Sequence, residues 1–239
     1  MRAPEGSSGS GAPAAPAVPA SYAQVRFERP AGSTVIHLVR HGESAPTDPD
    51  RPFPLVDGRG DPELSETGRA QAEALGRRLS GQQLDAIYVT QLRRTVQTAA
   101  PLALALGART LVEPDLVEVH MGEWEGGAYR RRIAERDPLA ARVFAEERWD
   151  VVPGAESNDS LRSRTAGAIE RIARAHPGGC VVAVSHAVAI SSVLAHATRS
   201  SPFAFIALDN ASVSTLVVSG DRWTLRCFND TAHLAGGWA

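Results

Sequence analysis

The chain of 239 residues contains no lysine, because all 25 of its basic residues are arginine. This absence excludes Schiff-base chemistry on a lysine and a phosphate-binding loop of the type that requires one. Acidic and basic residues nearly balance, with a formal net charge of -2 and an isoelectric point near 6.4. The chain lacks the excess of basic residues that is typical of nucleic-acid-binding proteins, so we expect no nucleic-acid partner.

Cysteine is scarce as well: the chain has two, Cys180 and Cys227, and both lie in strand-like sequence. We expect both to be reduced thiols in the core. The chain also lacks any run near the ~18 consecutive apolar residues of a membrane-spanning helix. We therefore expect no membrane partner.

The N-terminal segment is rich in Ala, Pro, Gly and Ser and lacks the Leu- or Val-rich stretch of a secretory signal. We interpret residues 1–31 as a disordered tail. Residues 32–239 show no second boundary and are expected to form one domain. We expect the protein to be cytoplasmic.

The remaining sequence alternates between strand-like and helix-like segments. Thr67 is a candidate cap for the first helix, and residues 45–62 are expected to form a loop. Further helices are expected at residues 92–106, 128–147 with a break near residue 137, 159–175 and 188–196, and strands at 35–39, 85–89, from 180 onward, 213–218 and 223–228. This alternation predicts an α/β fold, a three-layer α/β/α sandwich with a mostly parallel central sheet.

Two of the expected strands end in histidine. An apolar run from Thr34 leads into Arg40, His41 and Gly42, and a second run from Cys180 leads into His186. In open α/β sheets, ligands bind beyond the carboxyl ends of the strands. The two histidines are therefore expected to converge on one site, beside a guanidinium group suited to phosphate.

Five motifs in order resemble those of the histidine phosphatase superfamily, also called phosphoglycerate mutase-like. The matching segments are Arg40–Glu43, Thr90–Ala99, Leu116–Gly126, Ser185-His186, and a last motif formed by Asn210–Val213 with Asn229–Leu234. The last motif is similar to endings of the phosphatase branch. The resemblance covers about residues 34–234, and Ala187 stands where the family usually has glycine.

The resemblance implies a phosphoglycerate mutase-like fold and a metal-independent phosphomonoesterase with no cofactor, acting on a small phosphorylated substrate. It assigns the nucleophile that forms a phosphohistidine to His41, and the acid/base carboxyl group to Glu118. It assigns further catalytic or substrate-binding roles to Arg40, Gly42, Ser44, Arg94 and His186. These residue types fit a phosphate monoester, which carries almost two negative charges at neutral pH.

Several alternatives stay open. Glu113, Glu123 and Glu125 compete with Glu118, although the spacing of the motif favours Glu118. The run Arg130–Arg132 is either a solvated helix face or a binding site for a second phosphate or a carboxylate. A phosphoglycerate mutase and a catalytically silent phospho-ligand-binding module are the alternative functions, and a homodimer is an open alternative to a monomer.

Overall fold

The computed structural model describes residues 21, 23–48 and 50–234, and a six-stranded sheet forms its centre. The sheet has the order β5-β4-β6-β1-β7-β8. Its strands are β1 (Thr34–Arg40), β4 (Ala86–Val89), β5 (Thr110–Val112), β6 (Cys180–Ser185), β7 (Val213–Ser219) and β8 (Arg222–Asp230). The pairs β4–β5, β4–β6 and β1–β6 are parallel, whereas β7 is antiparallel to both β1 and β8. The prediction of a mostly parallel sheet is confirmed.

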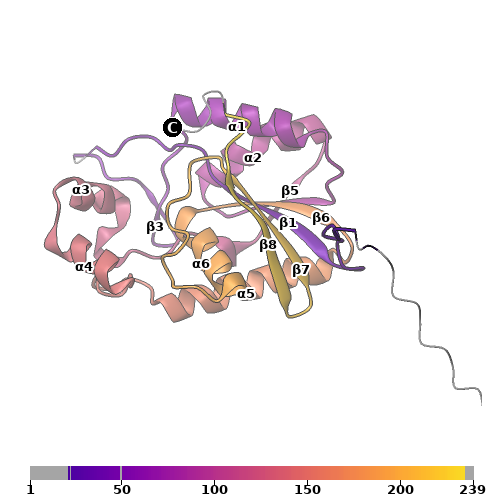
Figure 1. Ribbon diagram of the computed structural model, residues 1–239. Helices are drawn as coiled ribbons and strands as arrows, with labels where there is room; N and C mark the ends of the chain where they lie inside the picture. Colours follow the sequence, from indigo (N-terminus) through magenta and orange to yellow (C-terminus); the bar gives the residue numbers. More distant parts are fainter. Residues whose placement is uncertain (1–20, 22, 49, 235–239) are drawn as a thin grey trace, which may run out of the picture.

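Helices cover both faces of the sheet (Figure 1). The helices α1 (Glu66–Leu79) and α2 (Arg93–Leu106) lie on one face, and α5 (Asn158–Ala175) and α6 (Ala187–Thr198) lie on the other. This arrangement confirms the three-layer sandwich.

The apolar alternation of the strands divides the core between the two faces. In β6, Val181 and Ala183 pack in the cluster formed with α5 and α6, whereas Val182 and Val184 pack in the cluster formed with α1 and α2. All four are almost inaccessible to water. Full burial of a valine-sized side chain stabilises a fold by roughly 1.5–3 kcal/mol, so β6 anchors both layers.

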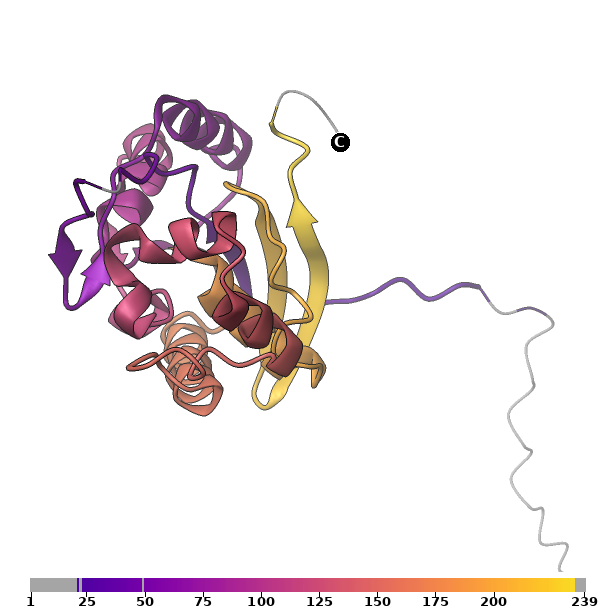
Figure 2. The same ribbon diagram turned by 90° about the vertical axis from the view of Figure 1, so that its left-hand side faces the viewer.

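A smaller substructure lies beyond the carboxyl ends of β1 and β6. It contains α3 (Ala128–Ala134), α4 (Pro138–Glu146) and the 3-10 segment η2 (Gly122–Gly127), whereas the 3-10 segment η1 (Pro114–Leu116) packs against α5 in the core of the sheet. Figure 2 views the molecule from this end. The buried side chains of Trp124 and Trp149 pack in the apolar cluster beneath α4. Both tryptophans therefore anchor this substructure, the lid, to the rest of the domain.

Some local expectations were wrong. The cap of α1 is Ser65, whose hydroxyl accepts a hydrogen bond from the N–H of Gly68 at 3.0 Å, and Thr67 lies inside the helix. The segment 45–62 contains the short antiparallel hairpin of β2 (Leu55–Val56) and β3 (Arg59–Gly60). Two residues per strand leave too little alternation for a sequence pattern to reveal.

The expectations for the ends of the chain and for the cysteines are met only in part. Most of the expected tail, residues 1–20 and 22, lies outside the described residues, as do 235–239 of the expected domain; residues 21 and 23–31 are mostly exposed and form neither helix nor strand. Cys180 and Cys227 are free thiols as expected, but both are partly exposed and not fully buried. Among the described residues, no helix combines the length and apolar character needed to cross a membrane.

Candidate active site

The parallel pairing of β1 with β6 places two histidines next to each other. Arg40 at the end of β1 is in register with Ser185 at the end of β6. The N–H of His41 donates to the carbonyl of Ser185 at 2.9 Å. The rings of His41 and His186 consequently lie side by side, with their centroids 5.2 Å apart.

The contacts of His41 fix its tautomer. Its Nδ1 lies 2.7 Å from the carbonyl oxygen of Gly42, and its Nε2 lies 3.2 Å from Nε of Arg94. A carbonyl oxygen only accepts and a guanidinium only donates, so the proton is on Nδ1 and Nε2 carries the lone pair. Burial, followed by the charges of Arg94 and Arg40, lowers the pKa of His41 well below its ordinary value. The ring is therefore neutral, and the unshared electron pair of Nε2 is available for chemistry.

Two guanidinium groups flank this nitrogen. Arg94 comes from the first turn of α2 and also donates to the carbonyl of Gly60 at 2.9 Å. Burial lowers the pKa of Arg94 to about 10, which leaves it charged at neutral pH. Arg40 donates to the carbonyl of Leu208, and its Nε has no hydrogen-bond partner among the described residues. Both guanidinium groups can therefore bind an anion, Arg40 through its Nε–H and Arg94 through its positive charge.

His186 lies behind His41 and is fully buried at the start of α6. Its Nε2 is 3.0 Å from the hydroxyl of Thr90, which follows β4, and its Nδ1 has no partner in the described part of the chain. Burial, followed by the charge of Arg94, lowers the pKa of His186 well below its ordinary value. The second ring is therefore also neutral while the site holds no anion.

Glu118 directs its carboxyl group at the N-terminus of α6. Its Oε1 accepts hydrogen bonds from the N–H groups of Val119 at 3.0 Å and Ala189 at 3.1 Å, and its Oε2 accepts from Val188 at 3.4 Å. Burial raises the pKa of Glu118 above its ordinary value, although these N–H groups and Arg94 act in the opposite direction. A carboxyl group with a raised pKa keeps its proton to higher pH, so it can act as an acid, and its ionised form can act as a base.

A cavity of about 680 Å³ lies in front of His41. Its wall is mainly apolar and aromatic on the lid side, where it includes Trp124, Tyr129 and Trp149. The charged residues of its wall come from widely separated segments: Arg40, Glu43, Arg59, Arg94, Glu118, Glu125 and Arg130. The wall therefore combines apolar and aromatic side chains with convergent charged groups, a combination typical of a small-molecule site.

Ser44 and Arg130 form one side of this cavity. Nη2 of Arg130, from α3, donates to the Ser44 hydroxyl at 2.6 Å, and Nη1 donates to the Ala45 carbonyl at 2.7 Å. Its guanidinium also lies 5.4 Å from the ring centre of Phe53. The other two arginines of the run pair elsewhere, Arg131 with Glu135 and Arg132 with Asp137. The run is thus divided between a cavity residue and a solvated face.

Gly42 does not line the cavity, although it holds His41 through its carbonyl group. A Cβ atom at this position would lie 2.6 Å from the carbonyl oxygen of Gly68 in α1. Glycine is therefore required for the close approach of two backbones. Its assignment to substrate binding stays a prediction.

The rival carboxylates have other contacts. Glu113 pairs with Arg171, and Glu125 accepts from the N–H groups of Gly60 and Met121. In the part of the chain that the structure describes, no group of three or more His, Cys, Asp or Glu side chains could hold a metal ion.

Sequence reasoning missed two residues at this site. Arg59 lines the cavity from the unpredicted hairpin, and its Nε donates to the Glu118 carbonyl at 2.8 Å. Asn210 donates to the His41 carbonyl at 3.0 Å and also lines the cavity. Asn210 begins the last of the five motifs named in the sequence analysis, so that motif was the signal that could have identified it.

The fold and the site define a phosphate-binding enzyme of the α/β sandwich class, and known proteins specify the family. The model of the histidine phosphatase superfamily (branch 1) matches residues 36–231. The chain is 35% identical over 204 residues to phosphoglycerate mutase-like protein 4 of Arabidopsis thaliana, an alignment that covers 83% of this chain and 86% of that relative. It is 34% identical over 200 residues to phosphoserine phosphatase 1 of Hydrogenobacter thermophilus, covering 82% and 92%. It is 32% identical over 206 residues to a metal-independent phosphoserine phosphatase of Arabidopsis thaliana, covering 84% of each.

Solved structures agree with this result. A mycobacterial glucosyl-3-phosphoglycerate phosphatase superimposes with a TM-score of 0.68 at 26% identity, covering 83% of this chain and all of that one. A phosphoglycerate mutase from Bacillus anthracis has a TM-score of 0.71 at 19% identity, covering 85% and 96%, and shares the fold. The chain belongs to the histidine phosphatase superfamily, with the predicted phosphoglycerate mutase-like fold. It is a hydrolase of phosphate monoesters.

Proposed function

We propose that the protein hydrolyses phosphate monoesters through a phosphohistidine on His41. The observation that carries this proposal is the neutral, buried ring of His41, whose Nε2 lone pair lies beside Arg94. Nε2 attacks phosphorus while the bond between phosphorus and the ester oxygen breaks, and Glu118 donates its proton to that oxygen. Water then attacks the phosphohistidine, Glu118 takes a proton from the water, and the N–P bond breaks to release phosphate.

The positive groups around Nε2 are proposed to stabilise the phosphoryl group. Charge spreads over its equatorial oxygens during transfer, and the guanidinium groups of Arg40 and Arg94 can meet that charge without a metal. His186 does not line the cavity, but its ring packs against His41 and its Nδ1 has no partner among the described residues, which supports its role as a further phosphate ligand. An arriving dianion favours the protonated form of that ring, so its pKa rises when phosphate binds.

Rapid-quench trapping tests the covalent step. Enzyme mixed with a ³²P-labelled aryl phosphate in EDTA should carry acid-labile label during turnover, and His41→Ala should carry none and lose activity. His196→Ala is the matched control, because His196 packs on Trp223 away from this cavity. Product formation without labelled enzyme would contradict the phosphohistidine, and activity that requires added magnesium would contradict metal independence.

The two alternative functions make different predictions. A mutase transfers the phosphoryl group to a second hydroxyl of its substrate, and ³¹P NMR would show a rearranged ester instead of inorganic phosphate. A silent binding module would bind phosphate without turnover. Both His41 and Glu118 lie on the wall of the same cavity, which argues against the silent module, since such a module needs the arginines but not both of these residues.

We further propose that the substrate carries a second anionic group that Arg130 binds. Within the described part of the chain Arg130 forms no ion pair, and its two hydrogen-bond acceptors are neutral. Burial lowers its pKa, which shows that its charge is partly desolvated. Two of the curated relatives are named phosphoserine phosphatases, and phosphoserine carries a carboxylate beside its phosphate ester.

Arg130→Gln tests this substrate class. We expect KM for phosphoserine to rise about 10-fold or more, because a charge-assisted hydrogen bond contributes about 1.5–3 kcal/mol, while KM for an aryl phosphate without a carboxylate changes little. Arg131→Gln is the control, since that neighbour pairs with Glu135. Equal rises for both substrates would show that Arg130 binds the phosphate itself.

A cytoplasmic location, a homodimer and a substrate contact of Ser44 also stay predictions.

A further inference from the structure

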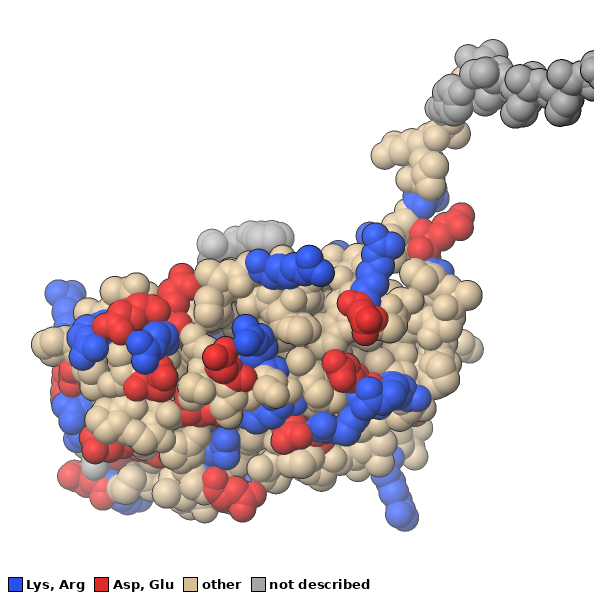
Figure 3. All heavy atoms as spheres, turned by 90° about the horizontal axis from the view of Figure 1, so that it is seen from below, with Lys and Arg blue, Asp and Glu red and all other residues tan. Residues whose placement is uncertain are grey.

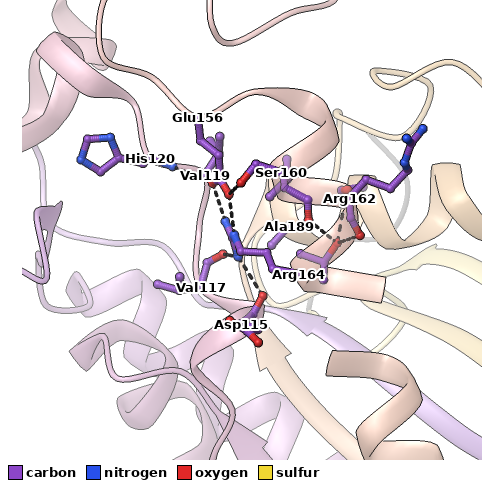
Figure 4. A network of polar contacts seen from close by, with 12 residues as sticks. Asp115, Val117, Val119, His120, Glu156, Ser160, Arg162, Arg164 and Ala189 are labelled. Carbon is purple, nitrogen blue, oxygen red and sulfur yellow. Dashed lines mark hydrogen bonds and ion pairs between the residues drawn. The ribbon is translucent and has the colours of Figure 1, made fainter. Parts of the chain in front are cut away.

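The main chain at Glu118 is held by a side chain of α5. Nη1 of Arg164 donates to the carbonyl groups of Asp115 at 2.8 Å and Val117 at 2.7 Å, and Nη2 donates to the carbonyl of Glu118 at 3.1 Å. Figure 4 shows this guanidinium against the loop that follows η1. One side chain thus satisfies three of four successive carbonyls that end at the acid/base residue.

The remaining carbonyl, that of Leu116, also accepts from a side chain, and that of Glu118 has a second donor. The hydroxyl of Ser185 donates to Leu116 at 2.6 Å, and Arg59 provides the second donor to Glu118. The loop that places Glu118 is therefore fixed by side-chain donors from three distant segments of the chain.

Arg164 is itself fixed by Glu156. Its Nε and Nη2 donate to the two carboxylate oxygens at 2.7 and 2.8 Å, a forked pair whose side chains are only 15% and 10% exposed. The same carboxylate accepts from the N–H of His120 at 3.3 Å, on the other side of Glu118. Burial alone would raise the pKa of Glu156, but the hydrogen bonds and charge of Arg164 bring it below its ordinary value. The Glu156 carboxylate therefore stays ionised near neutral pH.

We propose that Arg164 is a positioning residue for the acid/base step, holding the main chain so that the Glu118 carboxyl group stays between the N-terminus of α6 and the leaving oxygen. The proposal rests on the proposed role of Glu118. Arg164 does not line the cavity, so it acts through Glu118 and not on the substrate. A displacement of about 1 Å at a catalytic group can cost about 10²-fold in rate.

Arg164→Lys tests the proposal, because lysine keeps the charge but cannot form the fork to Glu156 and to three carbonyls together. For an alkyl phosphate, a poor leaving group, kcat/KM should fall about 10- to 100-fold. For p-nitrophenyl phosphate it should fall far less, because kcat/KM covers only the steps through phosphorylation of His41 and this leaving group departs without a proton.

A matched control exists on the same helix. Arg171 lies two turns along α5 and pairs with the carboxylates of Glu113 and Asp115 at 2.7 and 2.6 Å, without a hydrogen bond to the carbonyl groups at Glu118. Arg171→Lys should leave the ratio of the two kcat/KM values unchanged. Should Arg164→Lys fail to fold, Glu156→Gln loosens the same fork and is measured in the same way.

A double-mutant comparison separates positioning from a general structural role. In a Glu118→Gln background, Arg164→Lys should change the ratio no further, because the acid it positions is already absent. If Arg164→Lys lowers kcat/KM equally for both substrates while Glu118→Gln does not, this inference fails and the proposed function stands. If Glu118→Gln itself lowers both equally, the assigned acid is wrong and the inference falls with it.

Discussion

In the proposed mechanism, His41 must remain neutral to attack phosphorus, yet it must lie among the positive charges that are proposed to bind phosphate. The structure satisfies both conditions with the same groups. Arg94 and Arg40 lower the pKa of His41 in addition to the effect of burial, and the carbonyl of Gly42 holds the proton on Nδ1. The charges that bind the substrate therefore also keep the nucleophilic nitrogen unprotonated.

Arg94→Gln should show this coupling. With one of the two positive charges removed, we expect the pKa of His41 to rise, and the acid limb of the kcat/KM profile to move to higher pH. ¹H–¹⁵N NMR of the imidazole ring measures the shift directly. Arg93→Gln is the control, since Arg93 pairs with Asp61 and is not among the causes of the lowered pKa. An unchanged pKa in Arg94→Gln would contradict the coupling.

At the scale of elements, the loop after β1 and the helix α1 meet through two glycines. A Cβ at Gly68 would lie 1.9 Å from the carbonyl oxygen of Glu43, and a Cβ at Gly42 would also strike the opposite backbone. Backbone atoms cannot move aside as a flexible side chain does. The segment that carries the nucleophile is therefore positioned by contact with α1.

Gly68→Ala should lower the free energy of unfolding by about 3 kcal/mol or more, at or above the upper end of ordinary overpacking. Gly81→Ala is the control, because nothing lies within 4 Å of the added methyl group. Chemical denaturation measures both variants. A loss at Gly68 no larger than at Gly81 would show that the backbones separate without cost.

The cap of α1 provides a second comparison within one turn. Ser65→Ala should cost about 1 kcal/mol, because it leaves the N–H of Gly68 without its hydroxyl partner. Thr67→Ala removes no cap and should stay within about 0.5 kcal/mol of the parent. Thermal unfolding of the two variants measures both losses of stability. A larger loss for Thr67→Ala than for Ser65→Ala would indicate that Thr67 is the cap.

Over the whole molecule, the arginines of the exposed surface differ from those of the cavity in the groups that they contact. On the side seen from below, both signs of charge are interspersed (Figure 3), and exposed pairs such as Arg162 with Asp159 contribute at most about 1 kcal/mol each. At the cavity, Arg94 and Arg130 instead contact neutral groups. A net charge of -2 therefore conceals a positive site.

The pH dependence of stability reflects this site. The folded-state pKa values of His41 and His186 lie well below the unfolded value of 6.5. Below that pH the unfolded chain binds protons that the folded chain does not, so stability falls as pH decreases, by up to about 1.4 kcal/mol per unit for each buried ring. Glu118, whose pKa is raised, acts in the opposite direction above the ordinary value of 4.5.

Denaturation in phosphate-free buffer between pH 7 and 5 checks this sign. His186→Asn should reduce the slope relative to the parent, whereas His196→Asn should not. Phosphate itself should stabilise the protein, because an anion that binds only the folded state raises its stability. A slope that is the same in all three proteins would show that the buried rings titrate normally.

Much of the site could be predicted from the sequence, because it depends on short patterns of neighbouring residues. Strand alternation and the rule that ligands bind at the carboxyl ends of strands bring His41 and His186 together, and the parallel register confirms why. The hairpin with Arg59 was missed because four paired residues leave no periodic signal. Consecutive residues of a helix point in different directions, so the run Arg130–Arg132 does not show by itself which arginine enters the cavity.

The sequence by itself determined the order of the elements, the two-layer core around β6 and the chemical groups available for phosphate, since these depend on residue type and on short periods. Only the tertiary structure decided which nitrogen of His41 is free, that Arg130 enters the cavity, and that Arg164 holds the Glu118 loop. Those contacts join residues 46 to 86 positions apart. Such pairs are brought together by the packing of whole layers, which no local pattern records.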